Sequence, residues 1–119
     1  MTRYKICIIG GHCGTRMFII MEYLEEYLKE AGYPCHMSHH SVWESYTVPP
    51  GTHLVLQLLP AFTEREAGCP VINIKPLIAD LHHPQTLHKI LEHLSIDYLA
   101  ITGRQPLIPA DNRIRTEVA

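Results

Sequence analysis

The N-terminal part of the chain joins a short apolar segment, a glycine pair and an amphipathic helix, and this combination restricts the fold more than any other feature. Residues 4–9 form an apolar run that predicts a buried strand, and Gly10-Gly11 ends it. Residues 15–31 carry apolar side chains at helical spacing, with Thr15 as the expected N-cap. A strand that leads through a tight glycine turn into such a helix favours a crossover to a parallel strand.

Further strands and helices follow along the chain. We expect strands at 34–40, 53–59 and 70–75, a helical turn at 63–67, a helix that starts at Pro84 and a short last strand at 97–102. This alternation predicts an α/β fold, a three-layer open sheet of about four parallel strands flanked by helices, as in Rossmann-like domains. We expect a single domain over 1–102, followed by an extended C-terminal tail over 103–119, which holds two prolines and several charges.

Composition narrows the class of function. The chain is 46% hydrophobic and 18% charged, which is typical of a globular protein. Its net charge is −2 and its ten basic residues are scattered, so no nucleic-acid partner is expected. The apolar stretches are too short for a bilayer span or a signal peptide, which predicts a cytoplasmic protein without membrane insertion. The four cysteines are widely spaced, so we expect free thiols.

The candidate site is the loop over residues 10–16. Ligands of parallel sheets bind beyond the carboxyl ends of the strands, where this loop and the segments that start at Ser41, Pro60 and Pro76 are expected. Backbone N–H groups and the helix dipole favour an anion there and lower the pKa of a thiol. We therefore predict that Cys13 is the catalytic residue and accepts a phosphoryl group. Six loop residues are predicted to bind the phosphate, namely Gly10, Gly11, His12, Gly14, Thr15 and Arg16. The alternative is that the glycines only form a tight turn and Cys13 is a small buried residue.

The chain has nine histidines, which raises the question of a metal site. His36, His39 and His40 lie near the second strand, and His82-His83 precede the last helix. Their spacing matches no zinc motif, and adjacent histidines point in different directions. We therefore predict neither a metal nor a cofactor, and we expect these histidines to be exposed or in loops.

Several segments of the chain match a known family in order and spacing. They are Lys5-Ile6-Cys7-Ile8-Ile9, Leu28-Lys29-Glu30-Ala31-Gly32-Tyr33-Pro34, His53-Leu54-Val55-Leu56, Pro70-Val71-Ile72-Asn73 and Leu87-His88-Lys89-Ile90-Leu91. Over roughly residues 4–94 the chain resembles the B component, enzyme IIB, of sugar phosphotransferase systems of the galactitol and ascorbate type. This resemblance implies a four-stranded parallel sheet and a phosphocarrier of sugar transport. Such a carrier takes phosphate from a histidine of enzyme IIA onto a cysteine directly after the first strand. It then passes the phosphate to sugar bound by the membrane enzyme IIC.

Two departures from the family pattern leave two functions open. Counted back from the helix without gaps, the position of the family's cysteine falls on Gly10, and Cys13 lies three residues later. The segment Leu58-Leu59-Pro60 is apolar where the resemblance implies hydroxyl residues near the phosphate. The first function is a phosphocarrier that acts through Cys13. The second is a non-catalytic enzyme IIB-like module that has lost the phosphocysteine and serves in regulation or in binding an anion or a partner.

Overall fold

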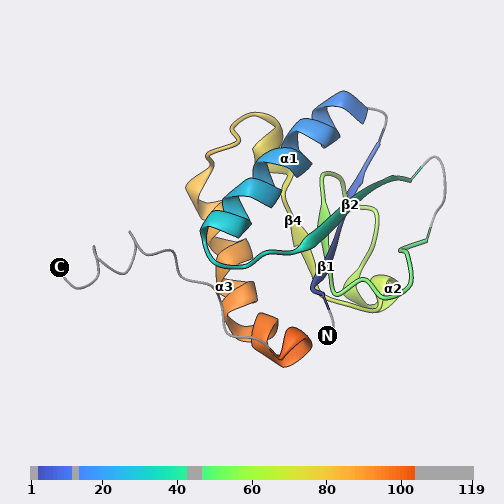
Figure 1. The fold of residues 1–119 in the computed structure, drawn as a ribbon. Coiled ribbons are helices and arrows are strands. Elements are labelled where there is room, and N and C mark those ends of the chain that lie inside the picture. Colours follow the sequence, from blue (N-terminus) through green and yellow to red (C-terminus); the bar gives the residue numbers. More distant parts are fainter. Residues whose placement is uncertain (1–2, 12–13, 43–46, 104–119) are drawn as a thin grey trace, which may run out of the picture.

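A computed structural model describes residues 3–11, 14–42 and 47–103 of the chain (Figure 1). The elements in chain order are β1 (Lys5–Gly10), α1 (Gly14–Glu30), β2 (His36–Ser41), β3 (Leu54–Gln57), α2 (Glu64–Ala67), β4 (Val71–Asn73), the 3-10 helix η1 (Lys75–Ile78) and α3 (Pro84–Thr102). The expected strand–turn–helix unit at the N-terminus is therefore present as β1 and α1.

The four strands form one parallel sheet in the order β2-β1-β3-β4. β1 is central, and its Cys7 is paired with Ser38 of β2 on one side and with Val55 of β3 on the other. The polar strand β2 and the short strand β4 are the edges. This topology confirms the predicted α/β fold with four parallel strands, including the parallel pairing of β1 with β3.

The two faces of the sheet are covered unequally. Ile8 and Leu56 belong to the face that packs against the long helices α1 and α3. Cys7 and Val55 belong to the opposite face, which packs against Phe62, α2 and the loops around it. The fold therefore has three layers, of which one outer layer is two long helices and the other is mostly loop.

Helix α1 forms because its buried side chains repeat at helical spacing. Met17, Ile20, Leu24 and Leu28 lie along one side of the helix and are buried against the sheet. The helix begins at Gly14, so Thr15 lies inside the first turn, and its expected role as the N-cap is wrong. It begins one residue earlier than the apolar periodicity predicts.

Helix α3 is longer than the sequence predicts. Pro84 is in its first turn, and the His83 side chain caps it by accepting a hydrogen bond from the Thr86 N–H. The helix continues to Thr102, so the expected last strand at 97–102 is wrong, because buried side chains go on repeating at helical spacing. The tail at 104–119 lies outside the described residues. Among the helices that the structure describes, none is long and apolar enough to cross a membrane.

Candidate functional site

Three segments of the chain meet at the carboxyl end of β1. The N–H of Val42 donates to the carbonyl of Gly10 at 3.1 Å, and the Ser41 hydroxyl donates to the carbonyl of Gly11 at 3.1 Å. The N–H of Leu58, the first residue after β3, donates to the backbone of β1 at 2.9 Å. The segments that follow β2 and β3 are thus attached to the start of the glycine loop, as the parallel topology predicts.

A cavity of about 280 Å³ lies at this edge of the sheet. Its lining residues are Gly10, Gly11, Arg16, Met17, Leu58, Leu59 and Ile78. Three of them, Gly10, Gly11 and Arg16, belong to the predicted phosphate-binding set. The other described lining side chains are apolar, so the described part of the cavity combines one cationic side chain with apolar walls.

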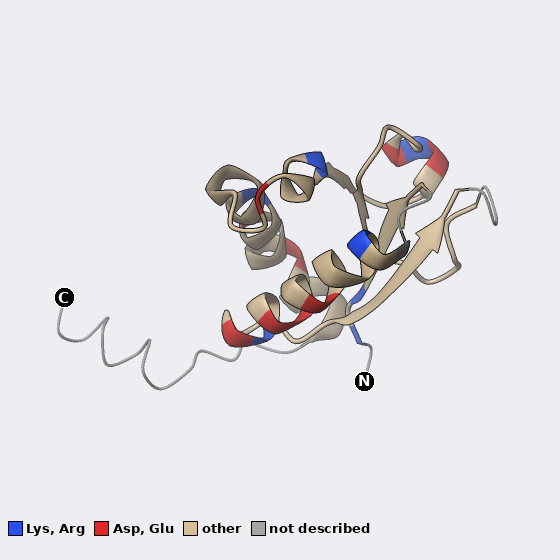
Figure 2. Cartoon of the chain, turned by 90° about the horizontal axis from the view of Figure 1, so that it is seen from above, with Lys and Arg blue, Asp and Glu red and all other residues tan. Residues whose placement is uncertain are grey.

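Arg16 supplies the positive charge of this cavity. Its Nη1 donates to the carbonyl of Ile78 at 3.2 Å, which ties the first turn of α1 to η1. A guanidinium has five N–H donors, so four remain after this bond. No carboxylate of the described residues forms an ion pair with Arg16. In Figure 2 the first turn of α1 is basic, and acidic residues follow along its later turns.

Gly10 lies where α1 and β1 approach each other closely. A Cβ atom at this position would lie 2.7 Å from the Met17 Sδ and 3.4 Å from the Leu58 Cδ1. Met17 is only 3% exposed, so it has little room to move away. A positive φ is not the reason for a glycine here, because the described glycines with positive φ are others, Gly32 among them. Any side chain at the end of β1 therefore competes with Met17 for the same space.

Gln57 fixes the apolar loop that forms one wall of the cavity. Its buried amide donates through Nε2 to the carbonyl of Phe62 at 3.1 Å and accepts the Phe62 N–H through Oε1 at 3.0 Å. These two bonds close a ring around residues 58–61. The sequence analysis did not single out Gln57, although a lone amide at the end of an apolar strand was a signal for such a role.

The structure brings only part of the predicted site together. His12 and Cys13 lie outside the described residues, so their roles stay predictions. Gly14 is the first residue of α1, and Thr15 is exposed in its first turn. Met17 and Ile78 also line the cavity, although neither is among the predicted site residues; Ile78 lies in the segment that starts at Pro76 and was expected at this edge.

The described cysteines are free thiols, as expected, and their surroundings disfavour the thiolate. Burial raises the pKa of Cys35 to about 12. Burial also raises the pKa of Cys7, against a smaller lowering by a hydrogen bond with Ser38. For Cys69 burial again raises the pKa, together with the nearby Cys7 and Glu64. All three thiols are therefore poor nucleophiles at neutral pH.

The histidines take structural roles where the structure describes their contacts. The His53 Nδ1 accepts the backbone N–H of Lys5 at 3.0 Å, and His82 Nδ1 lies 2.9 Å from the Tyr23 hydroxyl. Within the described part of the chain, no group of three or more His, Cys, Asp or Glu side chains is arranged to hold a metal ion. These contacts attach loops to neighbouring strands and helices.

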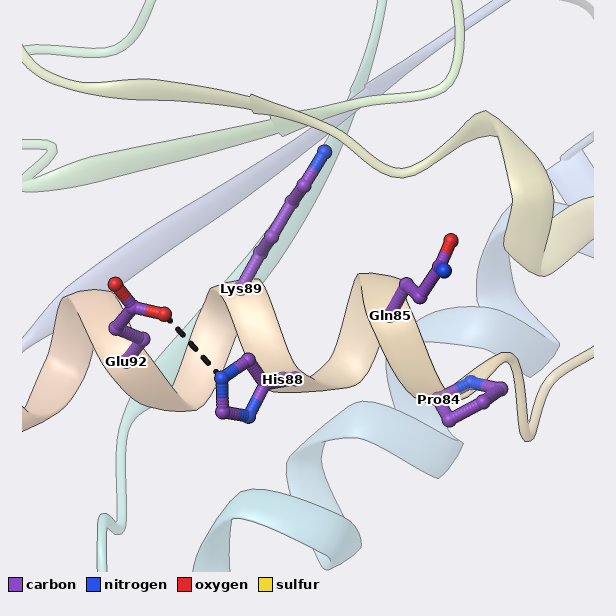
Figure 3. Close-up of a pocket in the computed structure, with 5 residues that line it drawn as sticks. All are labelled: Pro84, Gln85, His88, Lys89 and Glu92. Atoms are coloured by element: carbon purple, nitrogen blue, oxygen red, sulfur yellow. Dashed lines mark ion pairs between the residues drawn. The ribbon is translucent and has the colours of Figure 1, made fainter.

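A second concave surface lies on the outer side of α3 (Figure 3). It has a volume of about 640 Å³, and the described residues that line it are Pro84, Gln85, His88, Lys89 and Glu92. All five come from one helix, and His88 Nε2 forms an exposed ion pair with Glu92 Oε2 at 3.3 Å. A ligand there would contact these side chains from one side only, so the cavity beside Arg16 is the stronger candidate.

The fold and the cavity define an α/β domain with a small, positively charged cavity at the carboxyl edge of a parallel sheet. Comparison of the chain with protein-family models, with curated proteins and with solved structures finds no match.

Proposed function

We propose that this chain is an enzyme IIB-like binding module that holds a small anion beside Arg16 and carries no phosphocysteine at the end of its first strand. The observation that carries the proposal is the packing around Gly10. A side chain at that position would lie against the Met17 Sδ at 2.7 Å, so the place that the resemblance gives to a nucleophile is filled by a core methionine. The apolar Leu58 on the other side also replaces the hydroxyl groups that the resemblance implies.

The charges around the cavity support the binding of an anion. Arg16 has no carboxylate partner among the described residues and keeps four N–H donors beyond its bond to Ile78. The cavity also lies beside the first turn of α1, where the helix dipole favours negative charge. Together these features attract an anion without requiring that it be transferred.

The second candidate function is phosphate transfer through Cys13. Residues 11–13 connect β1 to α1, and a thiol just before the N-terminus of a helix is activated by the helix dipole. The three described thiols have raised pKa values and do not compete with it. In this function the chain would act in the cytoplasm between enzyme IIA and the membrane enzyme IIC.

Two measurements on the full chain separate these functions. Intact mass after incubation with a phosphoenolpyruvate-driven phosphorelay tests covalent transfer, and NMR titration with inorganic phosphate tests reversible binding. We expect no phosphoryl mass gain, and we expect shifts of the Gly10 and Gly11 amides that are lost in Arg16→Gln. Arg65→Gln, which removes an exposed cation on α2, is the matched control. A mass gain that disappears in Cys13→Ser would refute the proposal and establish the phosphocarrier.

A further inference from the structure

We infer that the ligand of the cavity beside Arg16 is a small carboxylic acid with an apolar body. The inference rests on the proposed function and adds the chemical class of the anion to it. It follows from the size of the cavity, the polarity of its described walls and the one cationic side chain among the described residues at its rim.

The size of the cavity sets an upper limit on the ligand. Its volume of about 280 Å³ is at the lower end of the range for ligand sites, roughly 300–1,000 Å³. A cavity of this size holds an acid of a few carbon atoms and leaves no room for a nucleotide.

The described walls of the cavity disfavour a ligand with many hydroxyl groups. Among the described lining residues, Arg16 has the only polar side chain, while Met17, Leu58, Leu59 and Ile78 are apolar. A sugar enclosed there would leave hydroxyl groups without partners, which is unfavourable. An alkyl body would instead cover Leu59, which is half-buried, and Ile78, which is 36% exposed.

The charge at the rim matches one carboxylate. Arg16 is the only cation in the described lining, and its planar guanidinium binds a carboxylate through two parallel hydrogen bonds. A doubly charged phosphate would keep part of its charge unpaired against apolar walls. Ile78 supplies both a wall and the carbonyl that positions Arg16, so the charge and the apolar surface are held together.

The test is a binding series on the full chain by NMR titration and calorimetry. The probes are acetate, butyrate, hexanoate, a short peptide that ends in leucine, inorganic phosphate and a hexose phosphate. We expect the affinity to rise by up to about fourfold for each added methylene until the cavity is full, since burial of a methylene contributes about 0.8 kcal/mol. We expect inorganic phosphate and the hexose phosphate to bind more weakly than butyrate.

Matched variants connect this series to the site. Arg16→Gln should abolish binding of all the acids, and Arg65→Gln should not. Ile78→Ser should flatten the dependence on chain length and keep the binding of acetate, while Ile96→Ser, at a remote isoleucine that is 76% exposed, should change nothing. Both isoleucines are on the surface, so neither change removes a buried core side chain.

The outcomes separate this inference from the proposed function. Arg16-dependent binding of phosphate with no gain along the acid series would overturn the carboxylic acid and leave the anion-binding module intact. Tighter binding of a peptide that ends in leucine than of hexanoate would overturn the assignment to a free acid. Absence of any Arg16-dependent anion binding would refute both.

Discussion

Gly10→Ala tests whether the contact between β1 and α1 determines the residue at the end of the first strand. The added Cβ would lie 2.7 Å from the Met17 Sδ, closer than two such atoms can approach, and Met17 is buried at 3% exposure. Overpacking of this kind destabilises the folded state by about 1–3 kcal/mol. Replacing glycine by alanine also lowers the conformational entropy of the unfolded chain, which stabilises the protein by about 0.4–1 kcal/mol. We therefore expect a net loss of roughly 0.5–2 kcal/mol in the free energy of unfolding.

A double-mutant cycle isolates this contact from other effects of the substitution. Met17→Ala alone should cost about 2–5 kcal/mol, because it leaves a space between α1 and the sheet. In the Met17→Ala variant the sulfur atom is gone, so the Cβ added by Gly10→Ala no longer clashes with it. Gly10→Ala should then be neutral or stabilising. Urea unfolding of the four proteins, followed by circular dichroism, measures the coupling. Additivity of the two changes within about 0.5 kcal/mol would refute the reasoning.

Three further predictions concern groups away from this contact. Gln57→Leu should lower the free energy of unfolding by about 1–3 kcal/mol in urea titrations, because the backbone of Phe62 loses two partners; an unchanged midpoint would contradict this. Because burial raises the pKa of Cys35 to about 12, the free energy of unfolding should keep its full value below about pH 9 and fall as the pH rises toward 12, where the unfolded chain ionises this thiol more readily. Cys35→Ala should reduce this loss of stability at alkaline pH, and an identical pH profile for the variant would contradict the prediction. Tyr4→Phe should cost about 1 kcal/mol by thermal unfolding, because the phenol donates to Asp97 at 2.6 Å, whereas an equal or higher melting temperature would argue against it.

The parts of the fold that the sequence predicts are those in which local pattern and tertiary packing agree. The apolar positions of α1 repeat at helical spacing, and the structure buries the same stripe. The segment 97–102 is different, because a short apolar run suits either a strand or a helix. Contacts between distant residues decide it: the Tyr98 hydroxyl donates to the carbonyl of Pro34 at 2.9 Å, and its ring contacts Tyr33 with centroids 5.3 Å apart.

The location of the candidate site is predictable, and its chemistry is less so. A glycine pair between a strand and a helix identifies the edge of the sheet where the cavity lies. The sequence alone suggests that Gly10 serves a turn, but its role is to admit Met17, which depends on how closely α1 approaches β1. Ile78 becomes a wall only because η1 packs beside the first turn of α1, a contact between residues 62 positions apart.

The unequal covering of the two sheet faces has a consequence for which parts of the protein unfold locally. Amide hydrogens of β1 and β3 are protected by the central position of these strands, so their exchange requires global unfolding. Helix α2 has a single turn without a buried residue, and β4 is an edge strand of three residues. We therefore expect the amide hydrogens of these two elements to exchange by local unfolding, at a lower free energy than those of the central strands. Changes in chain length are therefore expected to be tolerated well around the exposed turn at Gly51, which lies outside every helix and strand.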